Sequence, residues 1–119
     1  MAAILIAEDD EQMRLFLAAA LRRAGYHVEA VGSGTEALAA LHGAGFDLLL
    51  ADVVMQGMDG IELARRVHET WPEIKVMFIT GFAAVALKAP PMGHGHARVL
   101  SKPVHLRELI REVGRVLAE

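Results

Sequence analysis

The fold is decided by the stretch AILIAED at residues 3–9, in which five consecutive apolar residues lead into two acids. A second stretch, LLLAD at residues 48–52, has the same design. Short apolar runs without alternation predict strands covered on both faces, as in a parallel sheet. If these two strands are neighbours, their carboxyl ends bring Glu8, Asp9 and Asp52 to one edge. Such like charges resist ionisation unless a hard cation such as Mg²⁺ lies among their oxygens.

Length and composition limit the class of protein. The 119 residues predict one domain, 1–119, and 54% apolar with 23% charged residues is ordinary for a folded chain. The absence of cysteine excludes disulfides, thiolate metal sites and thiol nucleophiles. A formal net charge of -3 argues against nucleic acid as a direct partner. No apolar stretch reaches the roughly 18 residues that span a bilayer. We therefore expect no membrane partner and a cytoplasmic location.

Short apolar runs alternate with helical periodicity along the whole chain. Strands are predicted at 4–7, 26–31, 46–51, 74–79 and 97–100, and helices at 13–24, 33–41, 61–71, 81–88 and 106–117. This alternation predicts an α/β fold, a doubly wound five-stranded parallel sheet. Pro90 and Pro91 shorten the fourth helix to about two turns. Sites in such folds lie beyond the carboxyl ends of the strands.

Polar residues follow the other predicted strands as well. Thr80 comes after the fourth, and Lys102 with Pro103 comes after the fifth. Together with the three acids, this order and spacing resemble the receiver domain of bacterial two-component response regulators over the whole chain. The family's usual loop after the aspartate is matched by Met55, Met58, Asp59 and Gly60. The resemblance implies a flavodoxin-like fold and a single receiver domain without an output domain.

The resemblance also implies a phosphoryl-transfer site. Asp52 would accept a phosphoryl group from a histidine kinase or a histidine phosphotransfer protein. Lys102 and the Thr80 hydroxyl would contact phosphoryl oxygens, and the Lys102–Pro103 peptide would be cis. Phosphorylation adds a charge of roughly -1.5 to -2, which would switch a protein-binding surface.

A metal site belongs to the same implied arrangement. Mg²⁺ would be bound directly by Asp9 and Asp52, through water by Glu8, and by the backbone carbonyl of Val54. In phosphoryl transfer such a cation neutralises oxygens, and catalysis depends on positioning and electrostatics.

The chain departs from the family pattern in three ways, of which the fourth helix shortened by Pro90 and Pro91 is one. Family members usually carry proline where this chain has Gln56, so the loop after Asp52 is expected to be more flexible. An aromatic switch residue usually precedes the lysine by three positions, and here it is Val99. The switch would therefore work through Thr80 and the backbone.

A narrower resemblance concerns residues 59–66, 77–87 and 99–103, which are similar to a single-domain cell-cycle regulator of the same family. Its unphosphorylated form is an adaptor for a Clp-type ATP-dependent protease. The function expected here is therefore a stand-alone receiver that acts on a protein effector and is no enzyme beyond self-phosphorylation and self-dephosphorylation. The alternatives are a phosphate sink or relay shuttle, and a metal-dependent phosphohydrolase. The last usually needs an aspartate two residues after its nucleophile, where this chain has Val54.

Three further groups of residues have a functional and an ordinary interpretation. His94 and His96 could share a metal or be solvent-exposed imidazoles. Met13 and Leu17 could belong to the core or to a docking patch for the phosphodonor. A partner surface or inward packing is equally compatible with Phe82, Val85 and Leu87.

Overall fold

The computed structural model describes residues 1–81 and 98–119. Its elements in chain order are β1 (Ala3–Ala7), α1 (Glu11–Arg23), β2 (His27–Val31), α2 (Gly34–Gly43), β3 (Leu48–Asp52), α3 (Gly60–Thr70), β4 (Lys75–Thr80), β5 (Arg98–Ser101) and α5 (Leu106–Ala118). The expected fourth helix lies outside the described residues, as do the two prolines that end it, the pair His94 and His96, and the apolar residues Phe82, Val85 and Leu87. No helix in the described ranges is long and apolar enough to cross a membrane.

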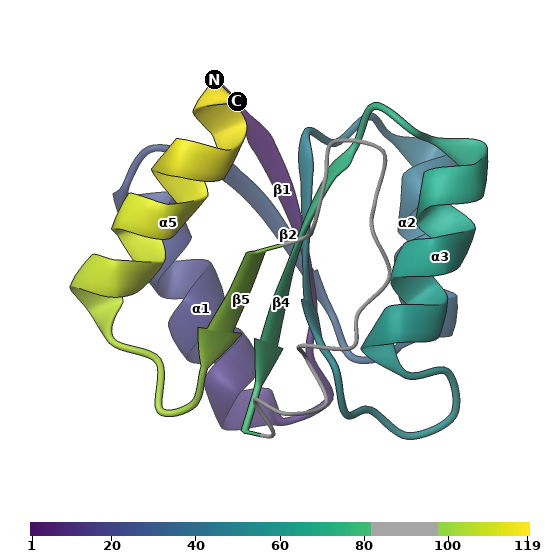
Figure 1. Cartoon of the computed structure of the whole chain (residues 1–119), viewed down its shortest axis with the longest axis horizontal. Coiled ribbons are helices and arrows are strands. Elements are labelled where there is room, and N and C mark those ends of the chain that lie inside the picture. The colour runs from purple at the N-terminus through teal and green to yellow at the C-terminus, as the bar shows by residue number, and fades with distance from the viewer. Residues whose placement is uncertain (82–97) are drawn as a thin grey trace.

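The five strands form one parallel sheet in the order β2-β1-β3-β4-β5. Helices α1 and α5 cover one face of this sheet, and α2 and α3 cover the other (Figure 1). The predicted doubly wound, flavodoxin-like architecture is therefore confirmed. From β1 the chain goes outward to β2 and then returns to β3 on the other side of β1. The strand order thus reverses between β1 and β3, and the carboxyl ends of these strands are where such folds bind ligands.

The continuous apolar runs are explained by a core on each face of the sheet. Along β1, Ile4 and Ile6 pack under α1 and α5, whereas Leu5 and Ala7 pack under α2 and α3. All four side chains are fully buried. Because successive residues of a strand point to opposite faces, a strand covered on both sides has to be apolar at every position.

Two of the predicted site residues belong to strands rather than to the loops that follow them. The third strand was predicted at 46–51, but it runs from Leu48 to Asp52, and Asp52 is paired with Ile79 of β4. Thr80 likewise ends β4 and is paired with Ser101 of β5. The backbone of Asp52 and Thr80 is therefore held by the sheet.

Side-chain caps fix where the helices begin. Asp10 accepts a hydrogen bond from the Met13 amide at 3.0 Å at the start of α1. Ser33 caps α2 through the Glu36 amide, and Asp59 caps α3 through the Glu62 amide. Each such cap contributes about 1 kcal/mol. The capped ends of α1 and α3 follow closely on the carboxyl ends of β1 and β3, so they help to fix the two loops of the candidate site.

Candidate functional site

Three carboxylates meet at the carboxyl edge of the sheet. Glu8 and Asp9 directly follow β1, and Asp52 is the last residue of β3. One oxygen from each side chain lies within 4.8 Å of the others. Glu8 and Asp52 are only 1% and 5% exposed, whereas Asp9 is open to solvent. The convergence expected from the strand ends is thus confirmed, and a cation can approach the cluster from the side of Asp9.

Lys102 brings the only positive charge that pairs with these carboxylates among the described residues. Its Nζ donates a hydrogen bond to Oδ2 of Asp52 at 2.8 Å and lies 3.5 Å from Oε1 of Glu8. Its backbone amide donates to the Thr80 carbonyl at 2.9 Å, and the Lys102–Pro103 peptide is cis, as predicted. Partial burial opposes the ammonium, but the hydrogen bond to Asp52 and the two negative charges outweigh it and raise the pKa of Lys102.

Glu8 is short of partners. Its Oε2 accepts a hydrogen bond from the Asp10 amide at 3.1 Å, whereas the buried Oε1 accepts none within the described structure. Burial, followed by the interaction with Asp52, raises the pKa of Glu8 from 4.5 to about 7. A buried carboxylate oxygen without a donor is costly unless a cation or a proton satisfies it. The donor set is entirely oxygen, which is what Mg²⁺ prefers, so these residues fit that ion.

The loop after Asp52 is tied to the cluster by backbone amides. The Val54 amide donates to Oδ1 of Asp52 at 3.1 Å, and the Gln56 amide donates to Oδ2 of Asp9 at 3.2 Å. A proline at position 56, which is usual in receiver domains, has no N–H to donate. Because this chain has Gln56 instead of proline, the loop after Asp52 can form this hydrogen bond to Asp9 on the other side of the site.

Gly60 is a site residue whose role the sequence did not reveal. Its amide donates to the Val53 carbonyl at 2.9 Å, which brings the start of α3 against the end of β3. A Cβ atom at this position would lie 2.1 Å from the carbonyl oxygen of Asp52. Only glycine allows this approach without displacing the backbone of Asp52. The one signal in the sequence is the Asp59–Gly60 pair, which matched the loop pattern but did not indicate this contact.

Arg14 is a second residue that sequence reasoning missed. It lies on α1, and its guanidinium donates a hydrogen bond to the backbone carbonyl of Glu8 at 2.9 Å. This contact ties the helix to the segment that presents both Glu8 and Asp9. An arginine in the first turns of a helix usually faces solvent, so its sequence position carried no signal.

The remaining predicted residues are placed as follows. Thr80 is fully buried at the end of β4, next to β3, and Val54 is 52% exposed beside the cluster. Val99 is partly buried and packs against the core under α2 and α3. Leu17 is buried in the core under α1 and α5, so its interpretation as part of a docking patch is wrong. The large apolar side chains that α1 exposes are Leu15 and Phe16.

Three carboxylates and one lysine thus meet at the switch point of a five-stranded parallel sheet, which is where such folds bind ligands. The chain belongs to the response regulator receiver domain family, which matches residues 4–114. The resemblance found in the sequence is therefore confirmed. Receiver domains act with histidine kinases and bind Mg²⁺ at an acidic pocket, and Glu8, Asp9 and Asp52 form such a cluster here.

Particular relatives sharpen this assignment. Over 114 residues the chain is 54% identical to the response regulator receiver protein CpdR of Brucella abortus, a match that covers 96% of this chain and 95% of that protein. It is 35% identical to part of the sensor kinase CckA of the same organism, covering 98% of this chain and 12% of the kinase. Among solved structures, the chemotaxis protein CheY4 of Vibrio cholerae superposes with a TM-score of 0.83 and 28% identity over 98% of each chain.

Proposed function

We propose that this protein is a stand-alone receiver in which Asp52 accepts the phosphoryl group. The observation that carries the proposal is the cluster itself. Oxygens of Glu8, Asp9 and Asp52 lie within 4.8 Å of one another, and Nζ of Lys102 is 2.8 Å from Asp52. The match over 95% of the length of CpdR supports a receiver that acts without an attached output domain.

In the transfer step, an oxygen of Asp52 forms a bond to phosphorus while the bond from phosphorus to the donor histidine nitrogen breaks. The nitrogen keeps the electron pair and takes a proton from water. Lys102 holds Asp52 in place before transfer and then pairs with a phosphoryl oxygen, and the Thr80 hydroxyl donates to another. When bound by Asp9, Asp52, the Val54 carbonyl and, through water, Glu8, Mg²⁺ supplies positive charge to the transferring oxygens.

The experiment that tests this function uses a phosphorylated histidine kinase or phosphotransfer protein as donor. Intact-mass measurement should show one phosphoryl group on the wild type and none on Asp52→Asn. The matched control is Asp59→Asn in the same loop, because asparagine caps a helix as well as aspartate does. Retention of the phosphoryl group by Asp52→Asn would refute the assignment. Continued turnover of generic phosphate esters would instead support a phosphohydrolase.

We further propose that the output is a protein-binding surface, used as an adaptor in Clp-type, ATP-dependent proteolysis during the cell cycle. The support is the 54% identity to CpdR. The test is a binding measurement between a purified Clp-type unfoldase and the wild type, with and without phosphorylation, alongside Asp52→Ala. A change of affinity on phosphorylation that Asp52→Ala lacks would support the adaptor. Equal affinities in every state would favour a phosphate sink or relay shuttle.

A further inference from the structure

Two of the three carboxylates in the cluster have one oxygen held by a backbone amide of their own loop. Oε2 of Glu8 accepts a hydrogen bond from the Asp10 amide at 3.1 Å, and Oδ1 of Asp52 accepts one from the Val54 amide at 3.1 Å. In each case the donor lies two positions further along the chain. Such contacts are formed by the loop itself and need no other element of the fold.

Asp9 obtains the same kind of contact from a distant segment. Its Oδ2 accepts a hydrogen bond from the Gln56 amide at 3.2 Å, and the two residues lie 47 positions apart. Asp9 is exposed, and an exposed carboxylate otherwise samples several rotamers. The hydrogen bond therefore fixes Asp9 relative to the loop after β3. A proline at position 56 has no N–H, so a chain with the usual proline cannot form this contact.

These three amides limit how the carboxylates can bind a cation. A carboxylate with one oxygen held by an amide binds a cation best through its other oxygen. Mg²⁺ demands near-ideal octahedral geometry, whereas Ca²⁺ accepts more ligands and often takes both oxygens of one carboxylate. An arrangement in which each acid has one oxygen already engaged therefore suits Mg²⁺ better than Ca²⁺.

We propose that the Gln56 amide is a positioning group that makes Asp9 a ligand through one oxygen and thereby raises the selectivity of the site for Mg²⁺ over Ca²⁺. The proposal rests on the proposed function, because it takes Asp9 as a metal ligand of the phosphoacceptor site. Beyond that function, it assigns part of the choice of metal to one hydrogen bond between two loops. The donor is the backbone, so the Gln56 side chain has no part in the effect.

The test compares Gln56→Pro, which removes the N–H, with Gln56→Ala, which keeps it. Calorimetric titration measures the Mg²⁺ and Ca²⁺ affinities of the full-length, unphosphorylated protein. Gln56→Pro should bind Mg²⁺ about tenfold more weakly and Ca²⁺ no more weakly than the wild type, so the ratio of the two affinities falls about tenfold. Gln56→Ala should have the wild-type ratio. An unchanged ratio in Gln56→Pro, or an equal fall in Gln56→Ala, would overturn the proposal.

A backbone ester separates the lost donor from the fixed φ angle of proline. The α-hydroxy analogue of glutamine, inserted at position 56, replaces the N–H by an oxygen and leaves the side chain in place. This ester variant should show the same fall in the affinity ratio as Gln56→Pro. A wild-type ratio in the ester variant would assign the effect of proline to the shape of the loop, and the role of the Gln56 amide would be refuted.

Amide proton exchange tests the contact in the absence of metal. In a chelator, the Gln56 amide should exchange about tenfold more slowly in the wild type than in Asp9→Ala, which lacks the acceptor. The Val54 amide, which Asp52 holds, should change much less and is the internal control. Equal exchange at Gln56 in the two proteins would show that the hydrogen bond does not persist in solution and would overturn the proposal.

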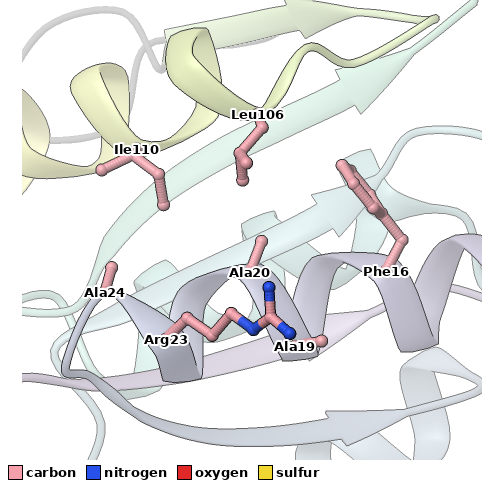
Figure 2. Close-up of a pocket in the computed structure, with 7 residues that line it drawn as sticks. All are labelled: Phe16, Ala19, Ala20, Arg23, Ala24, Leu106 and Ile110. Atoms are coloured by element: carbon pink, nitrogen blue, oxygen red, sulfur yellow. The ribbon is translucent and has the colours of Figure 1, made fainter.

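A control variant on α1 shows whether any disturbance near the site has the same effect. An apolar groove of about 410 Å³ lies between α1 and α5, and Phe16, Ala19, Leu106 and Ile110 are among its lining residues (Figure 2). None of the residues that line it belongs to the acidic cluster. Ala19→Leu should therefore leave the affinity ratio unchanged. A tenfold fall in this variant would mean that the ratio does not report on the Gln56 contact, against the proposal.

Failure of this role and failure of the proposed function give different results. If the wild type carries a phosphoryl group that Asp52→Asn lacks, and Gln56→Pro keeps the wild-type affinity ratio, only the role of the Gln56 amide is refuted. If Asp52→Asn retains the phosphoryl group, the phosphoacceptor assignment fails whatever the affinity ratio is.

Discussion

At the amino ends of the strands, charged side chains are paired with one another, whereas at the carboxyl ends three carboxylates share one lysine. Arg98 contacts Glu112 at 3.1 Å and Glu119 at 2.7 Å, and Asp47 accepts a hydrogen bond from the Ala3 amide at 2.8 Å. At the opposite edge, an oxygen of Glu8 is buried without a hydrogen bond from any described residue. The charged groups named at the amino end thus have partners within the described structure, whereas at the carboxyl end the Glu8 oxygen is left for a cation or a proton to satisfy.

The largest expected effect tests how closely Gly60 packs against the backbone of Asp52 at the carboxyl end of the sheet. Gly60→Ala places a Cβ 2.1 Å from the Asp52 carbonyl oxygen, so the backbone must shift, and we expect a loss of about 3 kcal/mol in the free energy of unfolding. Gly114→Ala is the matched control, because a Cβ there meets nothing within 4 Å. That helix-interior change should stabilise by about 0.5–1 kcal/mol. Urea denaturation measures both, and similar small effects would contradict the close packing at Gly60.

Removing one cation from each end sharpens the contrast. Lys102→Met leaves two buried carboxylates without their ammonium, so we expect a loss of about 2 kcal/mol at pH about 8 without metal. Arg98→Met breaks exposed pairs and should cost less than about 1 kcal/mol. Millimolar Mg²⁺ should recover much of the first loss and none of the second. Equal losses of unfolding free energy in the two variants would show that the carboxylates at the carboxyl end do not depend on the Lys102 ammonium more than an exposed ion pair depends on its arginine.

The raised pKa of Glu8 predicts how stability depends on pH. Because the pKa is about 7 in the folded protein and 4.5 without the fold, the folded state binds the proton more tightly. The metal-free protein should therefore gain on the order of 1 kcal/mol as the pH falls from about 8 to about 6, and lose it as the pH rises again through about 7.

Urea unfolding in a chelator at several pH values measures this slope. Glu8→Gln should flatten it, and Mg²⁺ should bind more weakly at the lower pH because protonated Glu8 is a poor ligand. A slope that persists in Glu8→Gln would assign the dependence to another group.

The smallest expected effect compares two arginines on one helix. Arg14 donates to the Glu8 carbonyl at 2.9 Å near the site, and Arg22 donates to the Val28 carbonyl at 3.0 Å at the other end of α1. Each alanine variant should cost about 1 kcal/mol of stability, because each removes one hydrogen bond from a charged donor. Only Arg14→Ala should also weaken Mg²⁺ binding, by roughly threefold to tenfold. Equal Mg²⁺ affinities in a calorimetric titration would show that Arg14 does not position the metal ligands.

Much of the fold could be predicted because its signals are local. A run such as that of β1 has to be covered on both faces, and the helical periodicity between runs shows where the covering helices lie. The bounds of the strands were less certain, since pairing between strands decides where each one ends. Asp52 was expected after its strand, but the pairing with Ile79 extends β3 to include it.

The residues of the candidate site also fall into those that local sequence position predicted and those that only contacts between distant segments revealed. The acids and Lys102 were predicted from strand ends and from the family resemblance, because each stands at a recognisable local position. Arg14 and Gly60 were missed because their importance lies in contacts with the backbone of distant or intervening residues. The sequence showed only that position 56 is not a proline. It did not indicate that the Gln56 amide contacts Asp9, which lies 47 positions away.

By itself, the sequence determined the alternating strands and helices, the parallel sheet and the edge at which the acids gather, because these follow from the spacing of apolar residues along one segment at a time. Only the tertiary structure decided which oxygen of Glu8 is left without a donor, that the Lys102 ammonium reaches Asp52 across 50 positions, and that α1 and α5 leave a groove between them. Those features depend on distances between side chains from separate elements, and such distances are set by packing rather than by order along the chain.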